Sequence, residues 1–370
     1  MRLLRYILFL FCVAVAISCS PINGHEPEFV RREKTLLVYM AGNNNLSDYA
    51  EMNLRDIKKG VVPTENNLLV YYHTYKTNPL LLRIAEDETG AVVQDTVYRF
   101  PECNSADPAS LTSALKVAGT MFPADEFGLI LWSHGTGWLP VGHYSKSFGQ
   151  EGKTEMDIKD MVKAFPFKLS YVVFDACLMG GIEVVYQMKD SVDYIVSSPT
   201  EVCSNGFPYS KIFNHIFSGK TDLVSLAQES FRYYNSMSGN ARYATVSVVN
   251  TSALDEVAAA TKTLFEKYRY DIPKLPVSNV QPYFRGNYHW YYDFGDFVTQ
   301  LAGEEDAAPV IEALQKAVIY KAATAYFYEL KIDPAKYSGL STYIPLRPVD
   351  VELDAYYKEL EWNKAVEMIK

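Results

Sequence analysis

Two side chains in this chain of 370 residues could act together as a nucleophile and a proton carrier. Cys177 follows the apolar run 171–176 (YVVFDA), and His134 follows the run 127–133 (FGLILWS). A thiolate is a strong nucleophile, and a nearby imidazole both favours the thiolate and supplies a proton to a leaving group. This pair therefore predicts a cysteine peptidase.

The residues around the pair predict how it is positioned. Short apolar runs bounded by small residues are typical of strands buried on both faces, and ligands bind at the carboxyl edge of such parallel sheets. The chain between His134 and Cys177 is long enough for a helical crossover between two parallel strands. Gly135 has no side chain, so we expect its N–H and the N–H of Cys177 to form an oxyanion hole.

Strands alternate with helices over the first two thirds of the chain, which predicts an α/β fold with a mostly parallel sheet covered on both faces. We expect helix caps at Ser47 and Thr154. Residues 34–250 are expected to form the core, and residues 251–370 a helix-rich region that packs on it. The expected strands are 34–42, 67–75, 127–132, 171–175 and 193–198, with a hairpin around Thr89 and Gly90; the helices are 46–59, 110–121, 154–165, 209–217, 223–237, 252–268, 293–302, 309–324 and 356–369; pieces 244–250 and 339–346 are expected at the sheet edge.

The first residues are typical of an export signal rather than of the fold. A basic start is followed by the apolar run 6–17, which is too short to span a membrane comfortably. Residues 16–19 (AISC) resemble a bacterial lipoprotein box, which implies removal of residues 1–18 and lipid attachment at Cys19. Residues 19–33 then form a tether. An ordinary signal peptide with an incidental cysteine is the alternative.

Composition narrows the class of protein further. Apolar residues make up 48% of the chain and aromatic residues 14%, which is enough for a large core. The net charge of −9 argues against a nucleic-acid partner. Beyond the export signal and Cys19 three cysteines remain, namely Cys103, Cys177 and Cys203, so at least one thiol stays unpaired. Cys177 is the expected one.

Other roles for these side chains are also compatible with the sequence. A lone cysteine on an apolar strand is most often a small buried hydrophobe, and a lone histidine is most often structural, as we expect for His73 and His215. His143 is a rival base, but it does not follow a strand. His134, His143 and Glu151 match no zinc spacing, so no metal and no cofactor are predicted.

Two segments that contain the pair, 129–138 (LILWSHGTGW) and 174–184 (FDACLMGGIEV), resemble the catalytic motifs of the clostripain family of cysteine peptidases, relatives of caspases and legumain. The resemblance continues through 36–57, 197–209, 339–346 and 356–369, and so covers essentially residues 35–369. It implies a caspase-like αβα sandwich, with Cys177 as the nucleophile and His134 as the base and acid.

The resemblance also implies cleavage after Arg or Lys. Asp175 matches the acidic residue beneath the specificity pocket of such enzymes, and the alternative is a strand-end carboxylate bonded to nearby backbone N–H groups. Glu201 and Asn205 fall where further pocket residues are expected. Because Asn205 is neutral, a second charge must come from Glu201.

Some members of the family are activated by self-cleavage in the loop after the catalytic histidine. Lys146 and Lys153 are the candidate sites here, and two solvated lysines are the alternative. Calcium is required by some relatives, but no EF-hand-like loop is present, so calcium is not predicted.

The resulting hypothesis is a lipid-anchored endopeptidase of the bacterial cell envelope that acts on peptides or proteins with Arg or Lys before the scissile bond. A second hypothesis is a catalytically silent surface-binding lipoprotein that keeps the peptidase fold. Aromatic clusters such as 288–294 (YHWYYDF) could provide its binding face, although a buried core is the more ordinary role for them. A third is another thiol enzyme on an α/β fold, such as an acyltransferase or amidase.

Overall fold

A central sheet of nine strands organises the part of the chain that the computed structural model describes, which is residues 30–142, 148–284, 290–346 and 350–370. Five neighbouring strands run parallel through its centre, and an antiparallel pair flanks them on each side. In spatial order the strands are β12 (Val318–Ala323), β10 (Thr245–Asn250), β9 (Val192–Ser197), β8 (Leu169–Asp175), β5 (Ala124–Trp132), β1 (Arg32–Gly42), β2 (Asn67–Thr74), β3 (Thr77–Glu86) and β4 (Val92–Arg99). The predicted mostly parallel sheet is confirmed.

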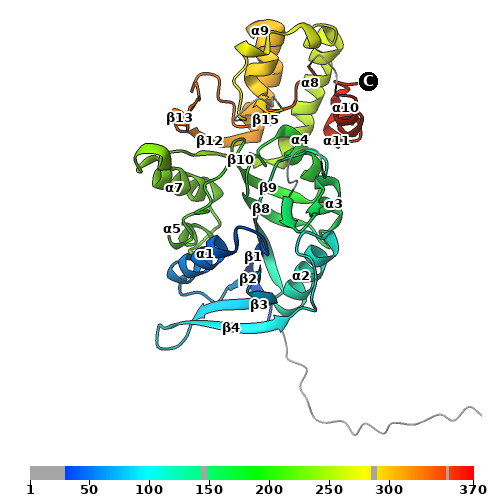
Figure 1. Ribbon diagram of the computed structural model, residues 1–370. Helices are drawn as coiled ribbons and strands as arrows, with labels where there is room; N and C mark the ends of the chain where they lie inside the picture. Colours follow the sequence, from blue (N-terminus) through cyan, green and yellow to red (C-terminus); the bar gives the residue numbers. More distant parts are fainter. Residues whose placement is uncertain (1–29, 143–147, 285–289, 347–349) are drawn as a thin grey trace, which may run out of the picture.

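Helices cover both faces of this sheet (Figure 1). Alternate residues of each strand enter opposite layers, as the period of two requires: Leu36 and Val38 pack in one core cluster, and Leu37 and Tyr39 in the other. The first layer holds α1 (Ser47–Lys59), α5 (Tyr209–Ile212), α6 (Asn214–Phe217) and α7 (Leu223–Asn235); the second holds α2 (Pro108–Met121), α3 (Ile158–Lys163), α4 (Ile182–Met188), α8 (Leu254–Tyr268), α9 (Phe294–Ala317), α10 (Val351–Lys358) and α11 (Glu361–Val366). The αβα sandwich expected from the sequence is therefore present.

The C-terminal region contributes an edge strand as well as helices. Residues 309–324 were predicted as one helix, but α9 ends at Ala317 and β12 follows it and pairs with β10. The piece 244–250 does join the sheet as β10. In the piece 339–346 only β15 (Ser341–Thr342) forms, and it pairs with β11 (Tyr292–Asp293) outside the nine-stranded sheet.

A buried carboxylate joins the C-terminal region to the core. Glu183, in α4, is fully buried, and its Oε1 accepts hydrogen bonds from the Tyr343 backbone N–H (2.9 Å), the Thr342 hydroxyl (2.9 Å) and the Tyr357 hydroxyl (2.8 Å). Burial raises the pKa of Glu183, while these donors act in the opposite direction. The helix that follows Cys177 is thus tied to chain segments about 160 residues away.

Two predicted helix caps are wrong. Ser47 is the first residue of α1, and its hydroxyl donates to the Gly42 carbonyl instead of capping the helix. Thr154 begins a short strand, β7 (Thr154–Met156), which pairs with β6 (Phe148–Glu151), and Asp157 caps α3 by accepting from Lys159 N–H. The cap therefore lies three residues later than expected, because tertiary pairing turns the predicted first helical turn into a hairpin.

The element α9 consists of two helices joined at a kink. It is broken at Gly303, whose φ of 78° lies in the left-handed region, and it carries Glu304, Glu305 and Asp306 just beyond the break. Across those ranges no helix combines the length and the apolar character needed to cross a bilayer.

Candidate active site

The predicted pair lies at the carboxyl edge of two neighbouring parallel strands. β5 and β8 are hydrogen-bonded in parallel, with Trp132 aligned to Asp175, so His134 and Cys177 each lie two residues beyond an aligned pair. The two chains stay together past the strand ends, since the Ser133 N–H donates to the Asp175 carbonyl over 3.4 Å. The structure therefore brings the two residues to the same part of the sheet edge.

Gly135 lies against the backbone of the loop that carries Cys177. A Cβ at this position would lie 2.6 Å from the Cys177 carbonyl oxygen and 3.1 Å from both Ala176 Cβ and Met179 Sδ. A backbone oxygen cannot rotate out of the way, so only glycine fits. The contact places the loop that carries His134 directly on the loop that carries Cys177.

We expect Gly135→Ala to lower peptidase activity at least about tenfold, because a small shift of reacting groups is costly in an active site, and to lower the free energy of unfolding by about 1–3 kcal/mol. Gly128→Ala is the matched control: its Cβ would lie 2.1 Å from the Tyr171 ring, in the middle of β5 and away from the edge. It should lower stability while sparing the specific activity of the folded fraction. A fully active Gly135→Ala protein with unchanged thermal stability would contradict the assignment.

The residue after Cys177 adopts a left-handed backbone. Leu178 has φ 62°, which costs a non-glycine residue about 1–3 kcal/mol. Its N–H donates to the Thr200 carbonyl over 2.9 Å, and the Gly180 N–H donates to the Ser198 carbonyl over 2.8 Å. The chain segment just beyond β9 therefore holds the sharp turn that presents Cys177 at the edge.

The thiol contacts the loop that follows β9. The Val202 backbone N–H donates to Cys177 Sγ over 3.3 Å, and Sγ also lies 3.7 Å from the Val202 carbonyl oxygen. Cys177 is half-buried. The loop 199–208, in which the sequence placed the specificity residues, is thus in contact with the proposed nucleophile.

His134 has a neighbour in the loop that follows the first strand. Its Nε2 lies 2.7 Å from Oδ1 of Asn45, in the loop between β1 and α1, although the two residues are 89 positions apart in sequence. Residues 43–45 lie between the strand expected at 34–42 and the helix expected at 46–59, and no contact of theirs was expected from the sequence. Because β1 is adjacent to β5 in the sheet, this turn ends at the same edge as His134.

Asp175 is the last residue of β8 and is buried, with 4% of its surface exposed. Its Oδ2 accepts hydrogen bonds from the Phe207 backbone N–H (2.9 Å) and the Tyr209 hydroxyl (2.6 Å). Burial raises the pKa of Asp175 to about 6, against the lowering effect of these two donors. Both contacts hold the end of the loop 199–208. The bond from the Phe207 N–H matches the alternative role given above, a strand-end carboxylate bonded to nearby backbone N–H groups.

The other two predicted specificity residues lie on that loop but on different sides of it. Asn205 is exposed and lines a cavity of about 230 Å³ beside α1, together with Asp56 and Tyr233. Glu201 is half-buried and lines a much smaller cavity with Val202. Glu201 and Asn205 therefore border different cavities, and Asp175 borders neither of these two.

The remaining predicted positions fall in different places. Lys153 is exposed in the turn between β6 and β7, the hairpin that follows the histidine loop. Lys146, His143 and Cys19 lie outside the described residues. His73, expected to be structural, is buried and contacts Ser105 through Nδ1, and burial lowers its pKa.

Three further observations hold for the described ranges. Cys103, Cys177 and Cys203 form no disulfide. No three His, Cys, Asp or Glu side chains there converge as metal ligands. Within 288–294, the structure describes residues 290–294, and their aromatic side chains are buried, so these residues belong to the core rather than to an exposed binding face.

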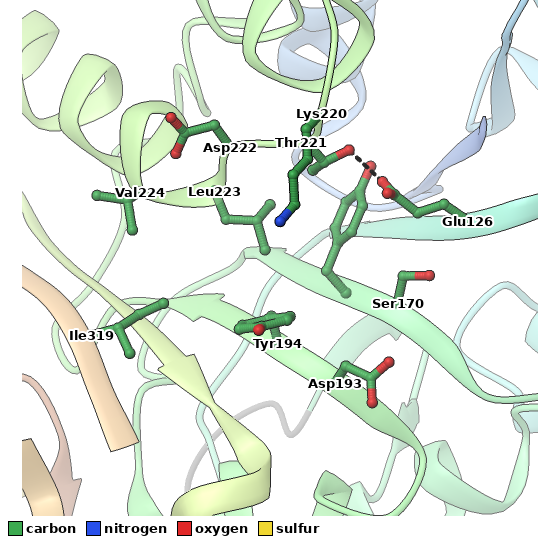
Figure 2. A pocket seen from close by; sticks show the side chains of 11 residues that line it. Glu126, Ser170, Asp193, Tyr194, Lys220, Thr221, Asp222, Leu223, Val224 and Ile319 are labelled. Carbon is green, nitrogen blue, oxygen red and sulfur yellow. Dashed lines mark hydrogen bonds between the residues drawn. The ribbon is translucent and has the colours of Figure 1, made fainter. Parts of the chain in front are cut away.

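A separate cavity of about 490 Å³ lies at the opposite, amino end of the central strands (Figure 2). Glu126 and Thr221 are hydrogen-bonded at one side, with Tyr194 on its floor and Ile319 across from them. Neither His134 nor Cys177 borders it. It is therefore distinct from the edge that carries the thiol and imidazole.

The sequence of this chain matches known peptidases. The model of the clostripain family matches residues 38–368. Clostripain of Hathewaya histolytica is 29% identical over 225 residues, which cover 50% of this chain and 42% of that protein. The match thus spans less than half the length of this curated relative.

Solved structures extend the similarity to nearly the whole chain. An inactive zymogen C11 protease from Parabacteroides distasonis is 37% identical, with a TM-score of 0.82, and the match covers 91% of this chain and 99% of that one. A secreted C11 cysteine protease from Bacteroides thetaiotaomicron, in complex with an irreversible peptide inhibitor, is 29% identical with a TM-score of 0.78, covering 90% and 99%.

Proposed function

We propose, from the premise that this chain belongs to the clostripain family of cysteine proteases, that it is an endopeptidase that cleaves peptide bonds after Arg or Lys. Cys177 is the nucleophile and His134 is the general base and acid. The observation that carries the proposal is the contact between the two loops at the carboxyl edge of β5 and β8, where a Cβ on Gly135 would lie 2.6 Å from the Cys177 carbonyl oxygen.

In the first half of the reaction the Cys177 thiolate attacks the carbonyl carbon of the scissile bond. The carbonyl oxygen becomes an oxyanion, which the N–H groups of Gly135 and Cys177 stabilise. Protonated His134 then gives its proton to the leaving nitrogen, the C–N bond breaks, and the amine product departs. The acyl group remains on sulfur as a thioester.

In the second half a water molecule attacks the thioester carbonyl while neutral His134 accepts one of its protons. The C–S bond breaks, the carboxylic acid product leaves, and the proton held by His134 together with the Cys177 thiolate restores the starting pair. Electrons and protons balance without a cofactor or a metal ion.

The basic specificity depends on Asp175. It is the last residue of β8 and lies two residues before Cys177, and we propose that its carboxylate faces the basic side chain of a bound substrate. A guanidinium or ammonium group there would form a charge-assisted hydrogen bond in a partly dry site and would favour the ionised carboxylate. Glu201, which neighbours Val202 on the loop 199–208, is proposed to approach the same basic side chain, whereas Asn205 borders a separate cavity beside α1 and is proposed to act on the outer part of the peptide.

The direct test uses purified protein that begins at residue 20 and fluorogenic peptides that differ only in the residue before the dye. We expect release from Arg- or Lys-linked peptides at least about 100-fold faster than from Gln- or Leu-linked peptides, because a buried carboxylate rejects a neutral partner. Faster turnover of simple esters or amides than of basic peptides would favour the acyltransferase or amidase alternative and would contradict the proposal.

Envelope location and activation are also part of the proposal. We propose that Cys19 carries the lipid that anchors the mature chain to the bacterial envelope. Self-cleavage in the loop after His134 is proposed at Lys146 or Lys153, and exposure of Lys153 in the hairpin turn supports its access to a protease.

A further inference from the structure

The contact between Asn45 and His134 assigns a proton to one ring nitrogen. Asn45 Oδ1 lies 2.7 Å from His134 Nε2. An amide oxygen can only accept a hydrogen bond, so Nε2 must be the donor. In neutral imidazole the other nitrogen is then an acceptor. The contact therefore leaves Nδ1 as the ring nitrogen that can exchange a proton with a thiol.

The loop that carries Asn45 is held by hydrogen bonds on both sides. The preceding residue, Asn44, accepts from the Leu46 N–H through Oδ1 (2.8 Å) and donates to the Gln150 carbonyl through Nδ2 (2.8 Å). Asn43 Nδ2 donates to Glu151 Oε1 over 2.8 Å. Gln150 and Glu151 belong to β6, the strand that follows the histidine loop. The three asparagines thus join the first strand to the chain segment that leaves His134.

A fixed acceptor of this kind matters for the chemistry. An imidazole that must receive a proton and later return it needs one orientation and one tautomer, and a third group commonly supplies both. A neutral amide does so without adding a charge to the site. A Cys, His and Asn set of this kind recurs on an unrelated fold.

We propose that Asn45 is a positioning residue for His134, and that it holds the imidazole with Nδ1 directed to the reaction. The proposal rests on the proposed function, in which His134 is the base and acid. Asn45 is itself exposed, so its replacement should leave the core intact. The competing role is purely local, as a turn residue before α1.

The test compares Asn45→Ala and Asn45→Asp with the unchanged protein in two assays: turnover of a Lys-linked fluorogenic peptide, and the rate at which iodoacetamide alkylates Cys177 between pH 5 and 9. We expect Asn45→Ala to lower kcat by about 10–100-fold with KM changed less than about twofold. Its alkylation profile should move to higher pH by about one unit, because the imidazolium that favours the thiolate loses its acceptor. Asn45→Asp restores an acceptor and adds a negative charge, so it should recover much of kcat and extend activity to higher pH.

Asn214→Ala is the matched control, since Asn214 is also exposed and its Oδ1 also accepts a hydrogen bond, from Ser218 over 2.6 Å, in α6. It should behave as the unchanged protein. An Asn45→Ala protein with unchanged kcat and an unchanged alkylation profile would overturn the proposal. The proposal would also be overturned if Asn45→Ala lost activity only in proportion to a lower melting temperature, with the pH dependence of Cys177 alkylation unchanged. Turnover that persists in Cys177→Ala would contradict the proposed function instead. In that case the alkylation profile of Asn45→Ala still shows whether Asn45 affects the reactivity of Cys177.

Discussion

Replacing Cys177 with alanine is expected to lower the hydrolysis of Lys- and Arg-linked peptides by at least about 10⁴-fold, because removal of a covalent nucleophile leaves only binding and oxyanion stabilisation. KM is not expected to fall enough to offset the loss of kcat, because the bond to sulfur forms only along the reaction path and not in substrate binding. The measurement is fluorophore release by the purified chain, followed for long enough to detect the residual rate. Folding should be unaffected, because Cys177 is only half-buried and its side chain is small.

Cys103→Ala provides the matched control for that result. Cys103 is also a half-buried thiol without a disulfide, but it contacts the Tyr71 hydroxyl, at 3.6 Å, rather than the loop 199–208. This variant should retain at least about half of the original rate, as expected for a substitution outside the reacting groups. Similar rates in the unchanged and Cys177→Ala proteins would exclude the mechanism.

The second large effect is expected at Asp175. Asp175→Asn should lower kcat/KM for Lys- and Arg-linked peptides by at least about 100-fold and should leave peptides with a neutral residue almost unchanged, because only the basic side chain loses its partner. The same change should alter the pH dependence. Since burial raises the pKa of Asp175 to about 6, kcat/KM of the unchanged protein for basic peptides should rise through about pH 6, and this limb should vanish in the variant.

The sign of the stability effect follows from the same pKa. A carboxyl group that binds its proton more tightly in the folded than in the unfolded chain adds stability below its unfolded pKa, and this contribution is lost as the pH rises through the folded value. For Asp175 the window runs from 3.8, the ordinary value, to about 6. Thermal unfolding of Asp175→Asn should lack this part of the pH dependence.

Asp293 allows the specificity role of Asp175 to be separated from its structural role. It is also fully buried, burial raises its pKa to about 6 as well, and it caps α9. Asp293→Asn should therefore change stability over the same pH window without changing the preference for basic peptides. If Asp175→Asn changes stability but keeps the preference for basic peptides, Asp175 has a structural role only. Its hydrogen bonds to Phe207 and Tyr209 would account for that role.

The sequence predicted the central strands well because each is a short apolar run buried on both faces. The position of His134 and Cys177 at one edge followed from two such runs ending in reactive residues. The strand β12 was missed because VIYKAA is half exposed and rich in residues that also favour helices, so pairing with β10 decides its conformation. The local sequence pattern does not show which distant strand a segment will pair with.

The contacts around the pair were less accessible from the sequence. Residues 43–45 have the composition of a turn, and nothing local indicates that Asn45 reaches a histidine 89 positions later. Val202 contacts Cys177 through its backbone, which any residue type could do. The strained Leu178 likewise carries no sequence signal, because left-handed positions usually favour glycine or asparagine. One indication was present in the sequence. The three asparagines follow the carboxyl end of the first predicted strand, and ligands bind at that edge of a parallel sheet.

The central claim is that His134 activates the Cys177 thiol, and the alkylation rate of Cys177 tests it most directly. The rate constant for iodoacetamide near pH 6.5 should be measured at Cys177 by mass spectrometry in the unchanged protein and in His134→Ala. The account predicts rapid alkylation that falls at least about tenfold in His134→Ala, because a thiol without a neighbouring imidazolium is mostly protonated at that pH. A Cys177 that reacts equally slowly in both proteins would contradict it and would favour a silent binding protein with the peptidase fold.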